Sequence, residues 1–149
     1  MTKPDISMTE EELDAYLLEQ RIVRLATADE EGTPHVVPLW FVWHEGGMFL
    51  NSTLGNVTVE NMLRSGTATG VVDSGEAYDE LRGATIAGGI ERLGDFAPDG
   101  VERAWSEKYL GGNEPPYRRW KNRSWFRLAP RSIASWDFRK IPEARAGRS

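Results

Sequence analysis

Thr33-Pro-His-Val-Val-Pro-Leu-Trp-Phe-Val-Trp43 decides the fold of this chain, because it is a long apolar stretch with an internal proline. It predicts one extended strand. A strand-like segment over 21–28 precedes it across the acidic turn 29–32, and another apolar run over 48–53 follows a Gly-Gly turn. Three strands joined by short turns predict a β-meander. Pro38 cannot donate to a neighbouring strand, so it marks an edge, a bulge or an opening of the sheet.

The rest of the chain alternates short helices with strands. The capping-box pattern Thr9-Glu-Glu-Glu12 predicts a helix over roughly 8–20. Two more helices are predicted over 56–65 and 102–110, and each ends at glycine. Further strands are predicted over four segments: 67–73, 81–93, 124–129 and 132–136.

Two features of the later strands predict a bent sheet. Gly83, Gly88 and Gly89 interrupt the strand over 81–93, and glycines inside a strand mark bulges or a close backbone approach. Pro130-Arg131 separates the last two predicted strands. The whole pattern predicts a mainly β fold, a small antiparallel barrel with helices on its rim.

Composition bounds the protein class. A length of 149 residues, 40% hydrophobic and 28% charged, predicts one domain over 1–149, with its core over about 9–140 and a basic tail over 141–149. The chain has neither a long apolar run nor a signal-like N-terminus, so we expect no membrane span and a cytoplasmic location. Cysteine is absent, which excludes disulfides and thiolate catalysis. The net charge of −5 argues against nucleic acid as a partner.

Several common sites have no support. The segment 83–89 has glycines spaced as in a phosphate-binding loop, but it lacks the lysine and lies in a predicted strand. No Gly-x-Gly-x-x-Gly or Gly-x-Ser-x-Gly motif occurs. The only histidines are His35 and His44, and without cysteine they predict no metal site.

The order of the segments over 9–140 resembles the flavin-binding split-barrel family. This family includes pyridoxamine 5′-phosphate oxidase and the small actinobacterial deazaflavin-dependent reductases. The resemblance rests on Pro34-His-Val-Val-Pro-Leu39, on the polar end of 48–53 and on the closing Trp136-Asp-Phe-Arg-Lys140. It implies a six- to seven-stranded antiparallel split barrel that uses F420 or FMN as an oxidoreductase. It also implies a homodimer that holds the cofactor between its subunits and acts on a small planar organic substrate.

The resemblance also assigns roles to residues. The cofactor-binding residues that it implies fall in four segments: His35, Val36, Pro38, Leu39 and Trp40; Asn51, Ser52 and Thr53; Asn56, Thr58 and Asn61; and Tyr78 and Arg82. The last segment resembles the part that a partner subunit contributes. His35 and Tyr78 are the candidate catalytic proton donors, ahead of His44.

One segment departs from the family pattern. Relatives carry Lys or Arg at the start of the helix after the third strand, where they pair with phosphate, whereas this chain has Gly55-Asn-Val-Thr-Val-Glu-Asn61. Restoring a charge by Thr58→Lys is therefore expected to tighten cofactor binding. The departure also leaves an alternative open: a repurposed barrel that binds no cofactor tightly and serves as a ligand-binding module or a redox-independent enzyme on a flat organic substrate.

Overall fold

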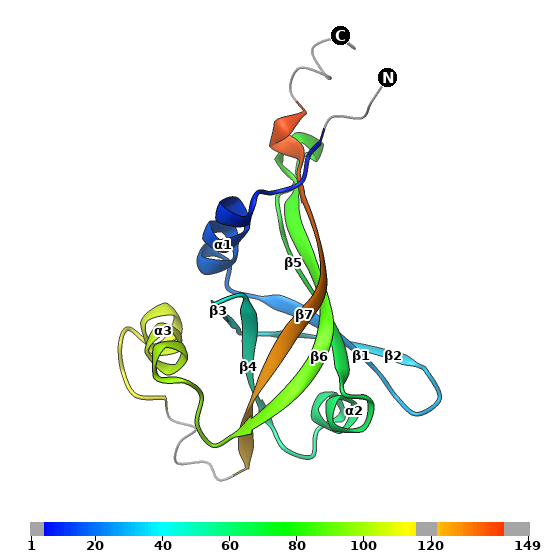
Figure 1. Ribbon diagram of the computed structural model, residues 1–149, viewed down its shortest axis with the longest axis vertical. Coiled ribbons are helices and arrows are strands. Elements are labelled where there is room, and N and C mark those ends of the chain that lie inside the picture. Colours follow the sequence, from blue (N-terminus) through cyan, green and yellow to red (C-terminus); the bar gives the residue numbers. More distant parts are fainter. Residues whose placement is uncertain (1–4, 116–121, 142–149) are drawn as a thin grey trace.

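The computed structural model describes residues 5–115 and 122–141. Within them a seven-stranded sheet has the order β2-β1-β5-β6-β7-β4-β3, and every neighbouring pair is antiparallel (Figure 1). The strands are β1 (Val23–Ala28), β2 (Pro34–Leu39), β3 (Val42–His44), β4 (Gly47–Thr53), β5 (Thr67–Ser74), β6 (Arg82–Gly94) and β7 (Arg123–Asp137). The helices are α1 (Glu10–Glu19), α2 (Val57–Ser65) and α3 (Asp99–Tyr109), with short 3₁₀ turns η1 (Tyr78–Glu80) and η3 (Phe138–Lys140). The predicted mainly β split barrel is confirmed.

The connection between β2 and β3 closes the barrel. The single strand predicted over 33–43 is wrong, because β2 and β3 are separate strands at opposite edges of the sheet. Only Trp40 and Phe41 join them, so the sheet must curl until its two edges approach each other. The predicted meander is therefore two hairpins, β1–β2 and β3–β4, which are not neighbours. Pro38 lies on the edge strand β2, as its missing donor requires.

A bulge replaces the predicted break in the last strand. β7 runs as one strand of 15 residues, so the separation at Pro130 is wrong. The register between β6 and β7 shifts at Ala87/Gly88, opposite Pro130, and a Cβ on Gly88 would collide with the carbonyl oxygen of Ala129. The glycine therefore permits the bend that the proline requires, and the predicted bulge is confirmed.

The helix ends follow the sequence signals. Thr9 and Glu12 form the predicted capping box at α1, since each side chain accepts the backbone N–H of the other. Asn56 caps α2 by accepting the N–H of Val59 at 2.8 Å, and Gly66 ends that helix in the left-handed conformation.

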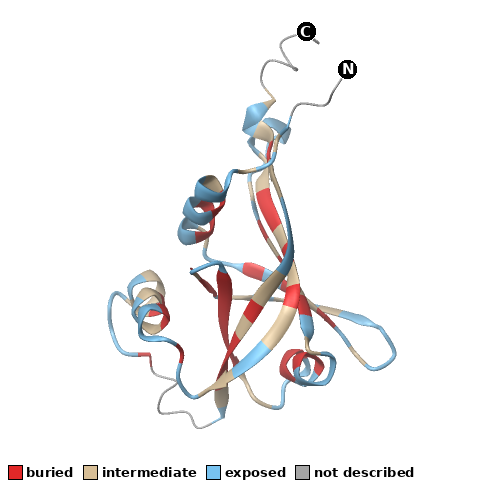
Figure 2. Ribbon diagram, viewed as in Figure 1, coloured by how far each residue is buried: buried red, intermediate tan, exposed pale blue. Residues whose placement is uncertain are grey.

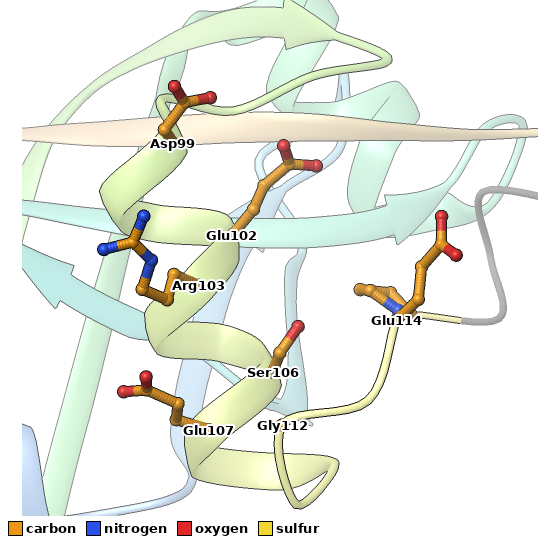
Figure 3. Close-up of a pocket in the computed structure, with 8 residues that line it drawn as sticks. Asp99, Glu102, Arg103, Ser106, Glu107, Gly112 and Glu114 are labelled. Atoms are coloured by element: carbon orange, nitrogen blue, oxygen red, sulfur yellow. The ribbon is translucent and has the colours of Figure 1, made fainter.

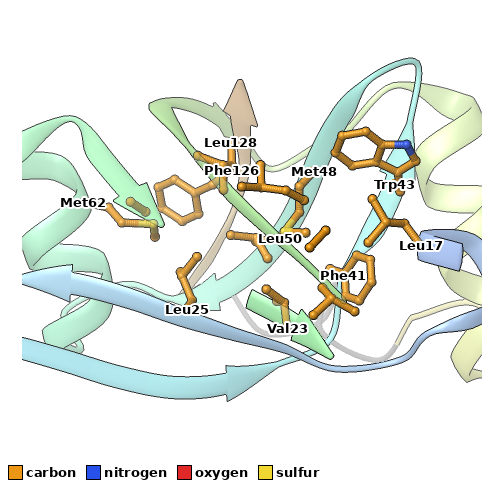
Figure 4. Close-up of a cluster of buried hydrophobic side chains, with 14 of the residues drawn as sticks. Leu17, Val23, Leu25, Phe41, Trp43, Met48, Leu50, Met62, Phe126 and Leu128 are labelled. Atoms are coloured by element: carbon orange, nitrogen blue, oxygen red, sulfur yellow. The ribbon is translucent and has the colours of Figure 1, made fainter. Parts of the chain in front are cut away.

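Two apolar clusters hold the fold together. The larger one lies inside the barrel beneath α1 and α2 (Figure 4), with fully buried side chains such as Leu25, Phe41 and Leu50. The smaller one packs α3 against β4 and β7 through Val101, Trp105 and Trp125, among others. In Figure 2 the buried positions alternate with half-buried ones along β5 and β6, as expected for a sheet with one face on the core.

Trp40 and Trp43 do not share a strand. Trp43 lies in β3, is buried, and donates its Nε1–H to Asp14 Oδ1 at 2.8 Å. Trp40 lies in the β2–β3 connection, is 42% exposed, and stacks on Tyr109 with ring centroids 4.4 Å apart. Trp136 is half-buried on β7, and its ring covers Gly83.

Among the described residues, none of the helices has the length and apolarity that a membrane crossing requires.

Candidate functional site

The end of β4 and the start of α2 bring three predicted site residues together. Asn51 and Ser52 are buried at the end of β4, and Asn56 caps α2. The Asn56 side-chain amide donates to Ser52 Oγ at 3.1 Å while its oxygen accepts from the helix backbone. Gly55, with φ of 91°, makes the tight turn that places these groups side by side.

Arg123 places a cation at the end of β4, whereas the first turn of α2 has no Lys or Arg. Its position opposite Thr53, at the start of β7, directs the guanidinium to the end of β4. Nε donates to Asn51 Oδ1 at 2.6 Å and one terminal nitrogen donates to Thr53 Oγ1 at 3.1 Å. The other terminal nitrogen donates to the Asn51 carbonyl at 3.2 Å. Two residues that were assigned to the cofactor are therefore bonded to a positive charge.

Sequence reasoning missed Arg123 because the pairing of β4 with β7 is long-range. The only signal was an arginine at the start of a late strand, and such residues are common on protein surfaces.

Thr58 and Asn61 lie inside the protein. Thr58 is 3% exposed and Asn61 is 5% exposed. The Asn61 side-chain amide donates to Thr27 Oγ1 at 3.1 Å, so it joins α2 to β1. Both side chains are therefore packed within the fold, and that of Asn61 is bonded to β1.

The predicted residues of β2 lie on two faces of the strand. His35 pairs with Thr27 and Leu39 pairs with Val23, and the side chains of Thr27 and Val23 point into the barrel. Because cross-strand partners share a face of the sheet, His35 and Leu39 lie on the inner face too. His35 is thus close to α2. Val36 lies on the outer face, where it is 60% exposed, and Pro38 and Trp40 are exposed as well.

Tyr78 and Arg82 lie at the other end of the barrel. Tyr78 is 56% exposed on η1 and its ring lies 4.9 Å from that of Phe138. Arg82 donates to Glu19 at 3.3 Å and covers the ring of Tyr16. The C-terminal end of α2 contacts β6 at Gly89 and Ile90, which follow Arg82 by seven and eight residues along the strand. At about 3.3 Å per residue, Arg82 is roughly 23 Å from that contact.

Residues from opposite ends of the barrel therefore do not meet within one chain. His44 lies on β3, the other edge strand, where its ring packs against Phe49 with centroids 6.3 Å apart.

The C-terminal end of α3 holds the β2–β3 connection. The Tyr109 hydroxyl accepts the N–H of Phe41, and its one proton is shared between the carbonyls of Arg21 and Phe41, each 2.8 Å away. Lys108 Nζ donates to the Leu17 and Phe41 carbonyls at 3.3 Å. Burial, with a smaller contribution from the nearby Arg21, lowers the pKa of Lys108 to about 8. Burial raises the pKa of Tyr109 to about 12, so its hydroxyl stays protonated at neutral pH.

Two pockets, each of about 430 Å³, are lined by described residues. One lies along α3, where Asp99, Glu102 and Glu107 project from the helix and Glu114 lies on the segment that follows it (Figure 3). This pocket contains none of the predicted site residues. The other lies between the β1–β2 turn and α2 and includes Asn61. Nowhere in the described ranges do three or more His, Cys, Asp or Glu side chains gather closely enough to hold a metal ion.

Known proteins share this architecture. The family model for pyridoxamine 5′-phosphate oxidase matches residues 9–137. The conserved hypothetical protein Rv2991 from Mycobacterium tuberculosis is similar with a TM-score of 0.80 and 26% identity, over 95% of this chain and 92% of its own. No curated protein matches.

Two more distant structures carry names that mention cofactors. A FAD-binding protein from Mesorhizobium loti has a TM-score of 0.67 and 21% identity, over 87% of this chain and 93% of its own. A protein named F420 reductase has a TM-score of 0.62 and 22% identity, over 80% and 94%. At these identities the likeness shows the fold alone, and the same fold also occurs in a heme storage protein.

Proposed function

The chain belongs to the pyridoxamine 5′-phosphate oxidase family, and we propose that it is an oxidoreductase that binds F420 or FMN at the junction of β4, α2 and β7. The observation that carries this proposal is Arg123, which adds a positive charge beside Asn51 and Thr53. The similarity to structures named as FAD-binding and F420 reductase proteins supports a flavin-type cofactor.

The residues at this junction suit the anionic end of such a cofactor. The guanidinium of Arg123 is a strong partner for phosphate, and the turn into α2 adds neutral donors from Ser52 and Asn56. The guanidinium is fixed by the hydrogen bonds that it donates to Asn51 and Thr53, so little side-chain entropy is lost when an anion binds. Arg123 therefore takes the place of the basic residues that relatives carry on α2.

The planar ring would lie along β2. β2 is an edge strand, so its outer peptide groups are free to bond a ring, and Val36, Pro38 and Trp40 present an apolar surface beside it. When bound, the cofactor supplies the hydride chemistry. The protein excludes water, orients a small planar organic substrate and provides a proton donor, for which His35 near α2 is the first candidate.

A homodimer would complete this site. The first half of β6 and the strands β1, β2 and β5 share an outer face of mostly small or apolar side chains. Its two charged residues, Arg24 and Asp73, pair with each other. The side chains of this face are Arg24, Ala26, Val36, Pro38, Thr69, Val71, Asp73, Thr85 and Ala87. A flat neutral sheet face of this kind favours a symmetric contact with a second copy. The partner could then bring Tyr78 and Arg82, which one chain holds apart from the junction.

Titration tests the proposal directly. The purified protein should quench FMN fluorescence or shift the F420 absorbance band on binding, and the bound cofactor should be reducible. Failure to bind either cofactor, with the fold intact, would leave the repurposed barrel as the better reading. The absence of Lys and Arg from the first turn of α2 and the presence of Glu60 there favour that second candidate.

A further inference from the structure

Lys108, near the C-terminal end of α3, places its amine against aromatic rings and backbone carbonyls. Its Nζ lies 4.1 Å from the centroid of the Phe41 ring and 5.4 Å from that of the Tyr109 ring. Among residues 5–115 and 122–141, no carboxylate forms a salt bridge with this amine. A half-buried ammonium group is usually paired with an acid, so this surrounding is unfavourable for the charged form.

Arg21 adds a second positive charge beside this amine. Its guanidinium lies 5.5 Å from the centroid of the Tyr109 ring and donates to the backbone carbonyl of Lys108. The rings attract an ammonium group, but burial first and Arg21 second lower the pKa of Lys108 to about 8. At pH 7.5 about a quarter of the amine is therefore neutral, compared with about one part in a thousand at a pKa of 10.5.

The hydrogen bonds around Nζ leave a lone pair for reaction when the amine is neutral. A neutral amine has two N–H groups, and Nζ has two acceptors, the carbonyl oxygens of Leu17 and Phe41, each 3.3 Å away. The proton of the Tyr109 hydroxyl goes to backbone carbonyls, so it does not occupy the lone pair. A desolvated amine beside another cation is the arrangement that makes a lysine nucleophilic.

We propose that Lys108 is a modification site that takes a small acyl group from an acyl phosphate. The Nζ lone pair attacks the acyl carbon, the N–C bond forms, and the C–O bond to the phosphate breaks. Phosphate leaves with the bonding electrons and the nitrogen releases a proton to solvent. Arg21 forms no salt bridge with a described carboxylate, so its charge is available to attract the phosphate group.

Acylation should loosen the connection between β2 and β3. The product is a neutral amide with one N–H, which cannot serve both the Leu17 and the Phe41 carbonyl. It also loses the attraction between an ammonium group and the Phe41 ring. Phe41 is fully buried within this connection, so the acylated protein should melt at a lower temperature than the unmodified protein.

The modification site does not depend on the proposed cofactor junction, so the test uses the protein without added cofactor. The protein is incubated with acetyl phosphate at pH 7.5, and peptide mass spectrometry follows its four lysines, Lys3, Lys108, Lys121 and Lys140. Lys140 is the internal control, because its Nζ is paired with Glu12 Oε1 at 2.7 Å. Lys108 should be acetylated at least about tenfold faster than Lys140. Its rate should level off above about pH 8.5, because the amine is then mostly neutral.

Arg21→Gln gives a second readout. It removes the repelling charge, so Lys108 should hold its proton more tightly and its acetylation at pH 7.5 should slow about threefold. Arg64→Gln is the matched control, because Arg64 also donates to a backbone carbonyl but lies on α2, and it should leave the rate unchanged. Melting curves verify that each variant is folded. Equal acetylation of Lys108 and Lys140 in the folded wild type would overturn the proposal, as would a Lys108 rate that Arg21→Gln leaves unchanged.

Discussion

Replacing Arg123 with Gln is the sharpest test of the cofactor junction. The variant loses the positive charge but keeps a polar side chain that can reach the end of β4. A charge-assisted hydrogen bond contributes about 1.5–3 kcal/mol, so FMN or F420 should bind roughly 10- to 100-fold more weakly. The loss should shrink at high salt, because an electrostatic contribution is screened there.

The same substitution has a cost in stability that must be separated from binding. Asn51 is 6% exposed and its side-chain oxygen accepts from Arg123, so the variant removes the donor of a buried acceptor. That loss should cost about 1–3 kcal/mol and lower the melting temperature by roughly 3–10 °C. Affinity should therefore be measured by fluorescence titration well below the melting temperature of the variant.

Two further variants control this experiment. Arg127→Gln removes another arginine from β7, whose nearest carboxylate is Glu91 at 3.8 Å, and should leave cofactor affinity unchanged. Arg123→Lys keeps the charge without the forked geometry and should bind with intermediate affinity. If Arg123→Gln melts earlier yet binds the cofactor as tightly as the wild type, Arg123 is only structural and the proposed junction is wrong.

Three more predictions follow from the fold. Val36→Glu should convert a dimer into a folded monomer in analytical ultracentrifugation, because it puts a charge on the neutral sheet face; a wild type that is already monomeric would contradict this. Lys108 binds its proton less tightly in the folded state (pKa about 8) than in the unfolded state (10.5), so stability should rise by about 1–2 kcal/mol from pH 8 to 10. The raised pKa of Tyr109 should make stability fall again above pH 10. When denaturation is measured as a function of pH, Lys108→Met should abolish the rise in stability. Thr58→Lys should lower the melting temperature instead of tightening cofactor binding, because Thr58 is 3% exposed and a charge there would be buried; an unchanged melting curve would refute this.

Local chemistry allowed much of the framework to be predicted. The capping box of Thr9 and Glu12 and the glycine that ends α2 depend on neighbouring residues, so their signals are complete in the sequence. The β1–β2 hairpin and the bulge at Gly88 were predicted for the same reason. The family resemblance then supplied the barrel, which no single segment could indicate.

Only the tertiary structure decided where these segments meet. Phe41 is drawn into the core and bonded by Tyr109, which cuts the predicted strand in two and sends β3 to the far edge of the sheet. The pairing of β4 with β7 brings Arg123 to Asn51 across 72 positions of sequence, and the length of β6 separates Arg82 from α2. Short-range hydrogen bonds leave signals in consecutive residues, whereas long-range pairing depends on how the whole apolar surface is buried, and that is settled only when the chain folds.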